Sequence, residues 1–150
     1  VTNRAGRIGT KPNQIAPHKR MLSSQTPVIV TRDNKVVLVT GSPGGRTIIN
    51  TSLQIVLNVL EFEMSLPEAV EIPRMHHQWF PDMLSFEGFS QPEYQQTLQQ
   101  LRAMGHKLQR RASQGSAHSI WVDSATGQFH GVADWRRGGL AAPVRAPETP

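Results

Sequence analysis

A glycine-rich turn, Gly41-Ser-Pro-Gly-Gly45, is the feature of this sequence best suited to chemistry. It follows a β-branched run at 36–40 and precedes a segment from Thr47 in which apolar residues have helical spacing. Backbone N–H groups without side chains, at the positive start of a helix, suit an anion, either a phosphate or a developing oxyanion. The P-loop pattern is not matched, because counting from Gly41 puts Arg46 at the second glycine and no lysine follows; the dinucleotide G-x-G-x-x-G pattern fails as well. On spacing alone, a tight strand-to-helix turn that binds nothing is the alternative to an anion site.

A serine pair, Ser23-Ser24, lies just before the first β-branched run. Paired hydroxyls in that position can bind a carboxylate, and a capping or turn role is the alternative. No G-x-S-x-G sequence surrounds either serine, so neither is predicted to be a nucleophile.

Two further polar pairs are predicted to be structural. His76-His77 is not expected to bind a metal, because neighbouring side chains point to opposite faces of a strand and there is no H-E-x-x-H sequence and no cysteine. A histidine held by hydrogen bonds beside Trp79 is expected instead. Arg136-Arg137, near Asp134, is predicted to be a solvated pair, with local ion pairing or an acidic partner as the alternatives.

Composition excludes several classes of protein. The chain has 150 residues and no cysteine, which removes disulfides, thiolate zinc sites and cysteine nucleophiles. Its length fits one domain or part of one. No apolar run approaches the roughly 18 residues of a membrane span, and residues 1–10 lack the apolar region of a signal peptide. No membrane contact is therefore expected from this segment.

The net charge of +5 does not predict a nucleic-acid surface. Five basic side chains and no acid lie in residues 1–20, whereas residues 47–104 carry only Arg74 and Arg102 against seven acids. The positive charge thus lies in two separated segments, and the tract between them would repel phosphate. A basic nucleic-acid module is the least favoured class.

The elements that must position these residues follow from hydrophobic periodicity and turn signals. The predicted order is two strands, three helices and three strands: 27–31, 36–40, about 47–60, 67–70, 91–104, 106–111, 119–123 and 128–133. Strands grouped at both ends with helices between them indicate an α+β fold, with helices stacked on a mostly antiparallel sheet.

Three details of these elements can be checked against a structure. Both apolar strands of the first hairpin are expected to be covered on both faces. The first helix is expected to be well buried, with a main apolar stripe of Ile49, Leu53, Val56, Leu57 and Leu60 and a second face of Ile48, Ile55 and Val59. The third helix is expected to have Ser90 as its N-cap, Glu93 at the capping-box position, Tyr94, Leu98 and Leu101 as its stripe, and Gly105 as its stop.

Five blocks of sequence, taken together and in order, resemble the C-terminal part of the small subunit of γ-glutamyltransferases (γ-glutamyl transpeptidases, glutathione hydrolases). The blocks are Lys19-Arg-Met-Leu-Ser-Ser-Gln-Thr-Pro27, Gly41-Ser-Pro-Gly-Gly45, Pro73-Arg-Met-His-His-Gln-Trp-Phe-Pro-Asp82, Gly115-Ser-Ala-His-Ser-Ile120 and Ala133-Asp-Trp-Arg-Arg-Gly-Gly-Leu-Ala-Ala142. The resemblance implies part of an N-terminal-nucleophile hydrolase, an αββα sandwich of antiparallel sheets with covering helices. In this family a precursor cleaves itself, and the new N-terminal threonine of the small subunit forms an acyl-enzyme with the γ-glutamyl group.

The resemblance also implies roles for four residues. Ser23 and Ser24 match the serine pair that holds the α-carboxylate of the glutamyl group, and the N–H groups of Gly44 and Gly45 match the oxyanion hole. The sequence departs from the family pattern at Met21, Gln25 and Arg46-Thr47; the last replaces a more usual Ser-Arg pair. These changes could alter the shape of the pocket and the acceptor preference.

Nothing before Ser23 matches the threonine nucleophile, so we expect a fragment that carries half of an active site and is inert alone. The expected divisions are an arm or connecting loop at 1–20, the small-subunit portion at 21–142 and a tail at 143–150.

The expected partners are the large subunit and the upstream part of the small subunit, with glutathione or another γ-glutamyl amide as donor and water, an amino acid or a peptide as acceptor. No cofactor is implied, and only the resemblance suggests a periplasmic or extracellular location. A related acylase acting on cephalosporin side chains or γ-polyglutamate, and a non-catalytic binding domain that has lost the chemistry, are the alternatives.

Overall fold

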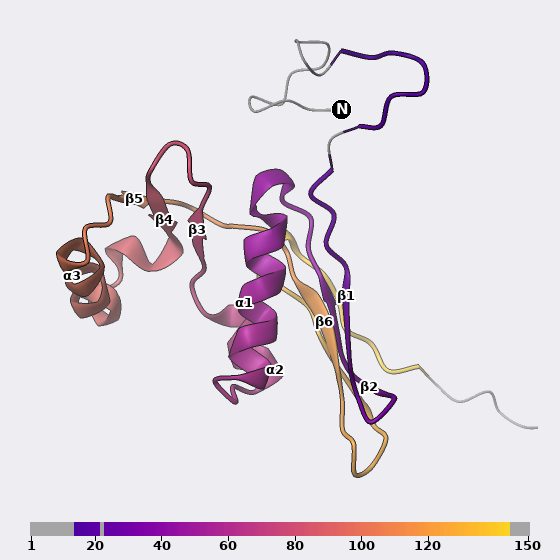
Figure 1. Ribbon diagram of the computed structural model, residues 1–150. Helices are drawn as coiled ribbons and strands as arrows, with labels where there is room; N and C mark the ends of the chain where they lie inside the picture. Colours follow the sequence, from indigo (N-terminus) through magenta and orange to yellow (C-terminus); the bar gives the residue numbers. More distant parts are fainter. Residues whose placement is uncertain (1–13, 22, 145–150) are drawn as a thin grey trace, which may run out of the picture.

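Two hairpins, one from each end of the chain, pair to form a four-stranded antiparallel sheet (Figure 1). The computed structural model describes residues 14–21 and 23–144. The sheet order is β1-β2-β6-β7. The strands are β1 (Val28–Arg32), β2 (Lys35–Gly41), β6 (His118–Val122) and β7 (Phe129–Val132). Both predicted hairpins are confirmed, and the pairing of β2 with β6 brings the two halves of the chain together.

Helices α1 (Ile48–Leu60) and α2 (Leu66–Glu71) cover one face of this sheet (Figure 1). The apolar core between sheet and helices consists of Leu38, Ile55, Val59, Leu66, Ala69, Val70 and Ala117. The predicted start of α2 is confirmed: Pro67 lies in its first turn, and Ser65 and Glu68 form a capping box. The other face of the sheet is only partly covered. Ile29 on the edge strand β1 is 66% exposed, so the expectation that both faces of the first hairpin are covered is wrong for the described chain.

The main apolar stripe predicted for α1 is confirmed only for Val56 and Leu60, which pack against the core. Ile49 and Leu53 are 52% and 53% exposed, and the buried face is the one that carries Ile48, Thr51, Ser52, Ile55 and Val59. Small side chains face inward here because backbone approaches closely: a Cβ on Gly115 would lie only 3.0 Å from Thr51 Oγ1. The spacing of apolar residues in the sequence does not reveal that small side chains are needed on this face of the helix.

A smaller three-stranded sheet lies on the other side of α1 (Figure 1). It contains β3 (Met75–His77), β4 (Leu84–Phe86) and β5 (Leu108–Arg110), and β4 and β5 are parallel. β5 falls within the predicted 106–111 strand, whereas β3 and β4 were not predicted, because strands of three residues show no periodicity. The fold is α+β, as expected.

Helix α3 (Gln95–Ala103) begins later than predicted. Two short 3-10 helices, Glu87–Ser90 and Pro92–Tyr94, precede it, so Ser90 is not its N-cap and no capping box forms there. Leu98 is fully buried, and Gly105, with φ +93°, ends the helix as predicted. The predicted arm at 1–20 and tail at 143–150 lie largely outside the described residues. Among those residues, no helix has the length and apolar character needed to cross a membrane.

Candidate functional site

The glycine turn, residues 41–45, joins β2 to a short 3-10 helix (Gly45–Thr47) that runs directly into α1. Gly44 and Gly45 have φ values of +149° and +58°, in the region that favours glycine. A Cβ on Gly44 would lie 2.6 Å from Thr47 Oγ1, whereas a Cβ on Gly45 would meet no atom within 4 Å. Gly44 is therefore required by conformation and packing, and the space beside Gly45 is open.

The backbone of this turn leaves two donors available. In the part of the chain that the structure describes, none of the turn, loop and cap hydrogen bonds is donated by the N–H of Gly44 or Gly45. The Gly44 carbonyl instead accepts the N–H of Thr47 at 3.2 Å and the Thr47 hydroxyl at 3.2 Å. No acidic side chain lies in the first turn of α1. Two unhindered N–H groups at the positive end of a helix can stabilise a negative oxygen.

Ser23 and Ser24 precede β1 at the end of the first hairpin where β1 begins and β2 runs into the glycine turn, since Val28 pairs with Thr40. Ser23 is exposed, and its Oγ accepts the N–H of Gln25 at 3.2 Å. The carbonyl of Thr26 accepts the hydroxyl of Ser52, in α1, at 3.1 Å, which ties this segment to the helix. Ser23 thus has a turn role, yet its own O–H can still donate to a carboxylate.

The side chains of four charged residues form a buried ion network: Arg74, Glu87, Asp134 and Arg136. Arg74 Nη2 donates to Asp134 Oδ2 at 2.7 Å, and Arg136 Nη2 donates to Glu87 Oε2 at 2.7 Å. The side chain of Arg136 is 1% exposed, so the prediction of a solvated pair is wrong for Arg136, whereas Arg137 is exposed. Burial alone would raise the pKa of Asp134, but hydrogen bonds from the N–H groups of Arg136 and Ala117 and from Arg74 outweigh it and hold the pKa below its usual value.

The local ion pair of Arg136 with Asp134, which the sequence offered as an alternative, is present, with Nη1 and Oδ1 3.3 Å apart. Sequence reasoning missed the other pairs because their members are far apart in the chain. Arg74 and Asp134 are separated by 60 positions, and Arg136 and Glu87 by 49. The available signal was the presence of Arg74, Asp134 and Arg136 inside blocks of family resemblance to which no role was attached.

The histidine pair occupies β3, with different environments for the two rings. His77 Nε2 lies 3.1 Å from Asp82 Oδ1, and His77 Nδ1 accepts the N–H of Trp79 at 3.1 Å, which confirms a histidine held by hydrogen bonds beside Trp79. His76 is buried; desolvation, followed by the charge of Arg111, lowers its pKa. Among the described residues, no group of three or more His, Asp or Glu side chains is arranged to hold a metal ion.

A serine–histidine contact between Ser116 and His118 does not form a nucleophile and its base. The Oγ of Ser116 lies 3.3 Å from Nε2 of His118, while Nδ1 of the same ring accepts the N–H of Asp134 at 3.2 Å. Because Nδ1 is the acceptor, the neutral ring carries its proton on Nε2 and donates to the serine. The histidine cannot take a proton from Ser116 in this arrangement.

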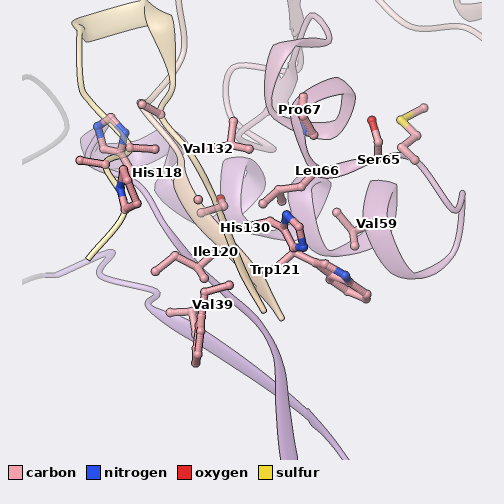
Figure 2. A pocket seen from close by; sticks show the side chains of 18 of the residues that line it. Val39, Val59, Ser65, Leu66, Pro67, His118, Ile120, Trp121, His130 and Val132 are labelled. Carbon is pink, nitrogen blue, oxygen red and sulfur yellow. The ribbon is translucent and has the colours of Figure 1, made fainter. Parts of the chain in front are cut away.

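A broad groove of about 1290 Å³ crosses β6 and β7 and the start of α2. Figure 2 shows Trp121, Val59 and Leu66 on one side of the strands, and Val39 and Ile120 on the other. None of the four predicted site residues lines it. Most of the labelled residues that line the groove are apolar, and no residue of the glycine turn lines it. The glycine turn therefore remains the candidate catalytic site.

Comparison with known proteins assigns the chain to a family. The family model described as gamma-glutamyltranspeptidase matches residues 1–144. The glutathione hydrolase proenzyme of Escherichia coli (strain K12) is 45% identical over 137 residues, which are 91% of this chain and 23% of that protein. The proenzyme of Pseudomonas aeruginosa is 40% identical over 125 residues, 82% of this chain and 22% of that protein. The chain therefore spans less than a quarter of the length of these relatives.

A solved structure agrees with the sequence comparisons. The gamma-glutamyltranspeptidase from Pseudomonas nitroreducens, complexed with L-DON, superimposes with a TM-score of 0.79 at 36% identity. The superposition covers 97% of this chain and 75% of that one.

Proposed function

Because the chain belongs to the gamma-glutamyltranspeptidase family, we propose that it is the C-terminal part of the small subunit of a glutathione hydrolase and supplies half of the active site. The complete enzyme hydrolyses or transfers the γ-glutamyl group of glutathione and related γ-glutamyl amides. The remaining catalytic groups, including the threonine nucleophile, belong to the part of the enzyme upstream of this chain, and the fragment alone is inactive.

The observation that carries the proposal is the pair of available N–H groups at Gly44 and Gly45. Attack of the threonine hydroxyl on the γ-glutamyl amide produces a tetrahedral intermediate with a negative oxygen. The two N–H groups, at the start of α1, bind that oxygen, and the open space beside Gly45 lets the substrate approach. A donor of this kind typically changes kcat by roughly 10²- to 10³-fold.

Ser23 and Ser24 hold the α-carboxylate of the donor. Their position at the end of the hairpin that carries the glycine turn supports this role, as does the free O–H of Ser23. Because the α-carboxylate stays distant from the bond that breaks, these contacts contribute to substrate binding more than to the chemical step. The large subunit and the upstream part of the small subunit complete the pocket.

Two alanine variants at matched glycines test the oxyanion role. Gly45→Ala and Gly127→Ala each place a side chain at a residue with positive φ, +58° and +73°, where a Cβ would meet no neighbour within 4 Å. Both variants carry the same conformational strain, but only Gly45 lies at the proposed site. Alanine keeps the backbone N–H, so Gly45→Ala acts through its Cβ, which enters the open space where the oxyanion and the substrate must lie. In the processed full-length enzyme, kcat for release of aniline from a γ-glutamyl anilide should fall by up to about 10²-fold, the cost of a displacement of about 1 Å from the reactive geometry. Equal kcat for the two variants would refute the placement of the oxyanion in the space beside Gly45.

The carboxylate role is tested with a substrate that lacks the carboxylate. The 4-aminobutanoyl anilide is the γ-glutamyl anilide without its α-carboxylate. Ser23→Ala and Ser24→Ala should each raise KM for the γ-glutamyl substrate and leave the weak reaction of the 4-aminobutanoyl substrate unchanged. An equal effect on both substrates would show that the serines act on the fold and not on the carboxylate.

A further inference from the structure

The hydroxyl of Ser42 connects the glycine turn to a distant segment of the chain. Its Oγ accepts the N–H of Ser116 at 2.8 Å and donates to the carbonyl of Pro43 at 2.7 Å. The hydroxyl therefore donates one hydrogen bond to a backbone carbonyl within the turn and accepts another from a backbone N–H 74 positions away. A serine so occupied is not available as a nucleophile.

Residues 114–117, which we call the platform, pack directly against the turn. Gly115, with φ +70°, faces Gly44 so closely that a Cβ on Gly44 would lie 3.3 Å from the Cα of Gly115. A Cβ on Gly115 would collide with Ser42 Oγ. The turn and the platform therefore pack without room for a side chain at Gly44 or Gly115, and only glycine fits at either position.

The buried ion network holds the platform at both ends. At one end, Glu87 Oε1 accepts the N–H of Gln114, and Arg74 Nη1 donates to the Gln114 carbonyl at 2.7 Å. At the other end, Asp134 Oδ2 accepts the N–H of Ala117 at 2.6 Å. Ser116, whose N–H reaches Ser42, lies between these two anchors. The platform is therefore a rigid base fixed by charge-assisted hydrogen bonds.

We propose that Ser42 is a positioning residue for acyl transfer: its bond to the Ser116 N–H fixes the glycine turn on the platform and so aims the N–H groups of Gly44 and Gly45. The inference rests on the proposed function, because it concerns the donors of the same oxyanion hole. Donors that are already oriented stabilise charge without rearranging during the reaction, and small displacements from that geometry are costly. Ser42 acts on the transition state through the turn and does not touch the substrate.

The test compares three variants in the processed full-length enzyme. Ser42→Ala removes the bond to Ser116, Ser42→Cys weakens it because sulfur is a poor acceptor, and Ser113→Ala alters an exposed serine just before the platform. Release from a γ-glutamyl anilide gives kcat and KM. The affinity of a γ-boronate analogue of glutamate, which forms a tetrahedral adduct with the nucleophile, reports on the oxyanion hole.

For Ser42→Ala we expect kcat to fall by about 10- to 100-fold, with KM unchanged and the boronate bound more weakly by the same factor. Ser42→Cys should lie between Ser42→Ala and the unmodified enzyme, and Ser113→Ala should match the unmodified enzyme. Subunit cleavage and the melting temperature show which variants fold. Where Ser42→Ala yields no folded enzyme, Ser42→Cys decides: a reduced kcat at constant KM supports the proposal, and an unchanged kcat overturns it.

Failure of the positioning role of Ser42 and failure of the proposed function give different results. An active enzyme that loses kcat in Gly45→Ala but keeps it in Ser42→Ala overturns the positioning role and leaves the proposed function intact. A parallel loss in kcat and rise in KM for Ser42→Ala also overturns it, because that result indicates a general loss of structure. An unmodified enzyme with no γ-glutamyl activity overturns both.

Discussion

Truncation of Asp134 should destabilise the region around the glycine turn more than any exposed substitution. The carboxylate accepts hydrogen bonds from Arg74 Nη2, from the N–H of Ala117, from the N–H of Arg136 at 2.9 Å and from Arg136 Nη1 at 3.3 Å. In Asp134→Ala the two backbone N–H groups lose their acceptor, and the two guanidinium groups keep only carbonyl acceptors and Glu87. The guanidinium of Arg74, whose side chain is 1% exposed, is then left with a buried charge that is only partly compensated.

The expected loss is about 3–5 kcal/mol, the range for breaking a buried ion pair by removing one partner. Glu87 stays paired with Arg136 and offsets only part of the lost charge at Arg74. Because each 1.4 kcal/mol is a factor of ten, amide exchange in the platform should accelerate by roughly two to three and a half orders of magnitude.

Hydrogen exchange of the platform amides, followed by mass spectrometry in the processed enzyme, measures this change. Asp123→Ala is the matched control, because Asp123 also accepts two backbone N–H groups but lies in an exposed turn. The double variant Arg74→Met/Asp134→Ala should lose less stability than the sum of the two single variants, since the unpaired charge is gone. Equal exchange in Asp134→Ala and Asp123→Ala, or strict additivity in the double variant, would refute the reasoning.

Three further predictions concern other parts of the chain. Burial lowers the pKa of His76, so below about pH 6.5 the unfolded state binds more protons and stability should fall with falling pH. The melting temperature between pH 7.5 and 5.5 should therefore depend less on pH in His76→Gln, and an unaltered slope contradicts this. Ser65→Ala removes the capping box of α2 and should cost about 1 kcal/mol in urea unfolding, with no change in KM. The isolated chain should self-associate through exposed apolar residues such as Ile29 and Leu53. Light scattering that shows a monomer, or association unaffected by Ile29→Lys and Leu53→Lys, contradicts that prediction.

The parts of the fold that the sequence predicts are those specified by local signals. The hairpins follow from β-branched runs around turn formers, and α2 follows from Pro67 and its cap. The family and the N-terminal-nucleophile hydrolase fold, predicted from five ordered blocks, are confirmed by the relatives and by the superposition on a solved gamma-glutamyltranspeptidase.

The errors arise where tertiary packing decides. Ser90 has the right spacing for an N-cap, but the turn containing Gly88 and Pro92 forms 3-10 helices instead. The inward face of α1 is set by the close approach of Gly115, which no local pattern reveals. The burial of Arg136 was not predicted because one of its two carboxylate partners, Glu87, lies 49 positions away, although the other, Asp134, lies only two positions away.

The candidate site shows the same division. A strand that ends in glycines and runs into a helix left an anion site and a plain turn as alternatives, and the family resemblance implied the oxyanion role of Gly44 and Gly45. Both residues have positive φ in the structure, and their role stays a prediction. Ser42 lies within the same five residues, but its role depends on Ser116, which only the fold brings near. The roles of Ser23 and Ser24 stay predictions, to be decided by the substrate comparison above.

The most direct test of the central claim uses the full-length parent of this chain. The purified protein is incubated, the masses of its subunits and the N-terminal residue of the small subunit are determined, and release from a γ-glutamyl anilide is followed in parallel. We predict cleavage that exposes a threonine, together with γ-glutamyl release that Gly45→Ala reduces. An uncleaved parent that releases nothing would contradict the catalytic claim and would leave this chain as a family member without the chemistry.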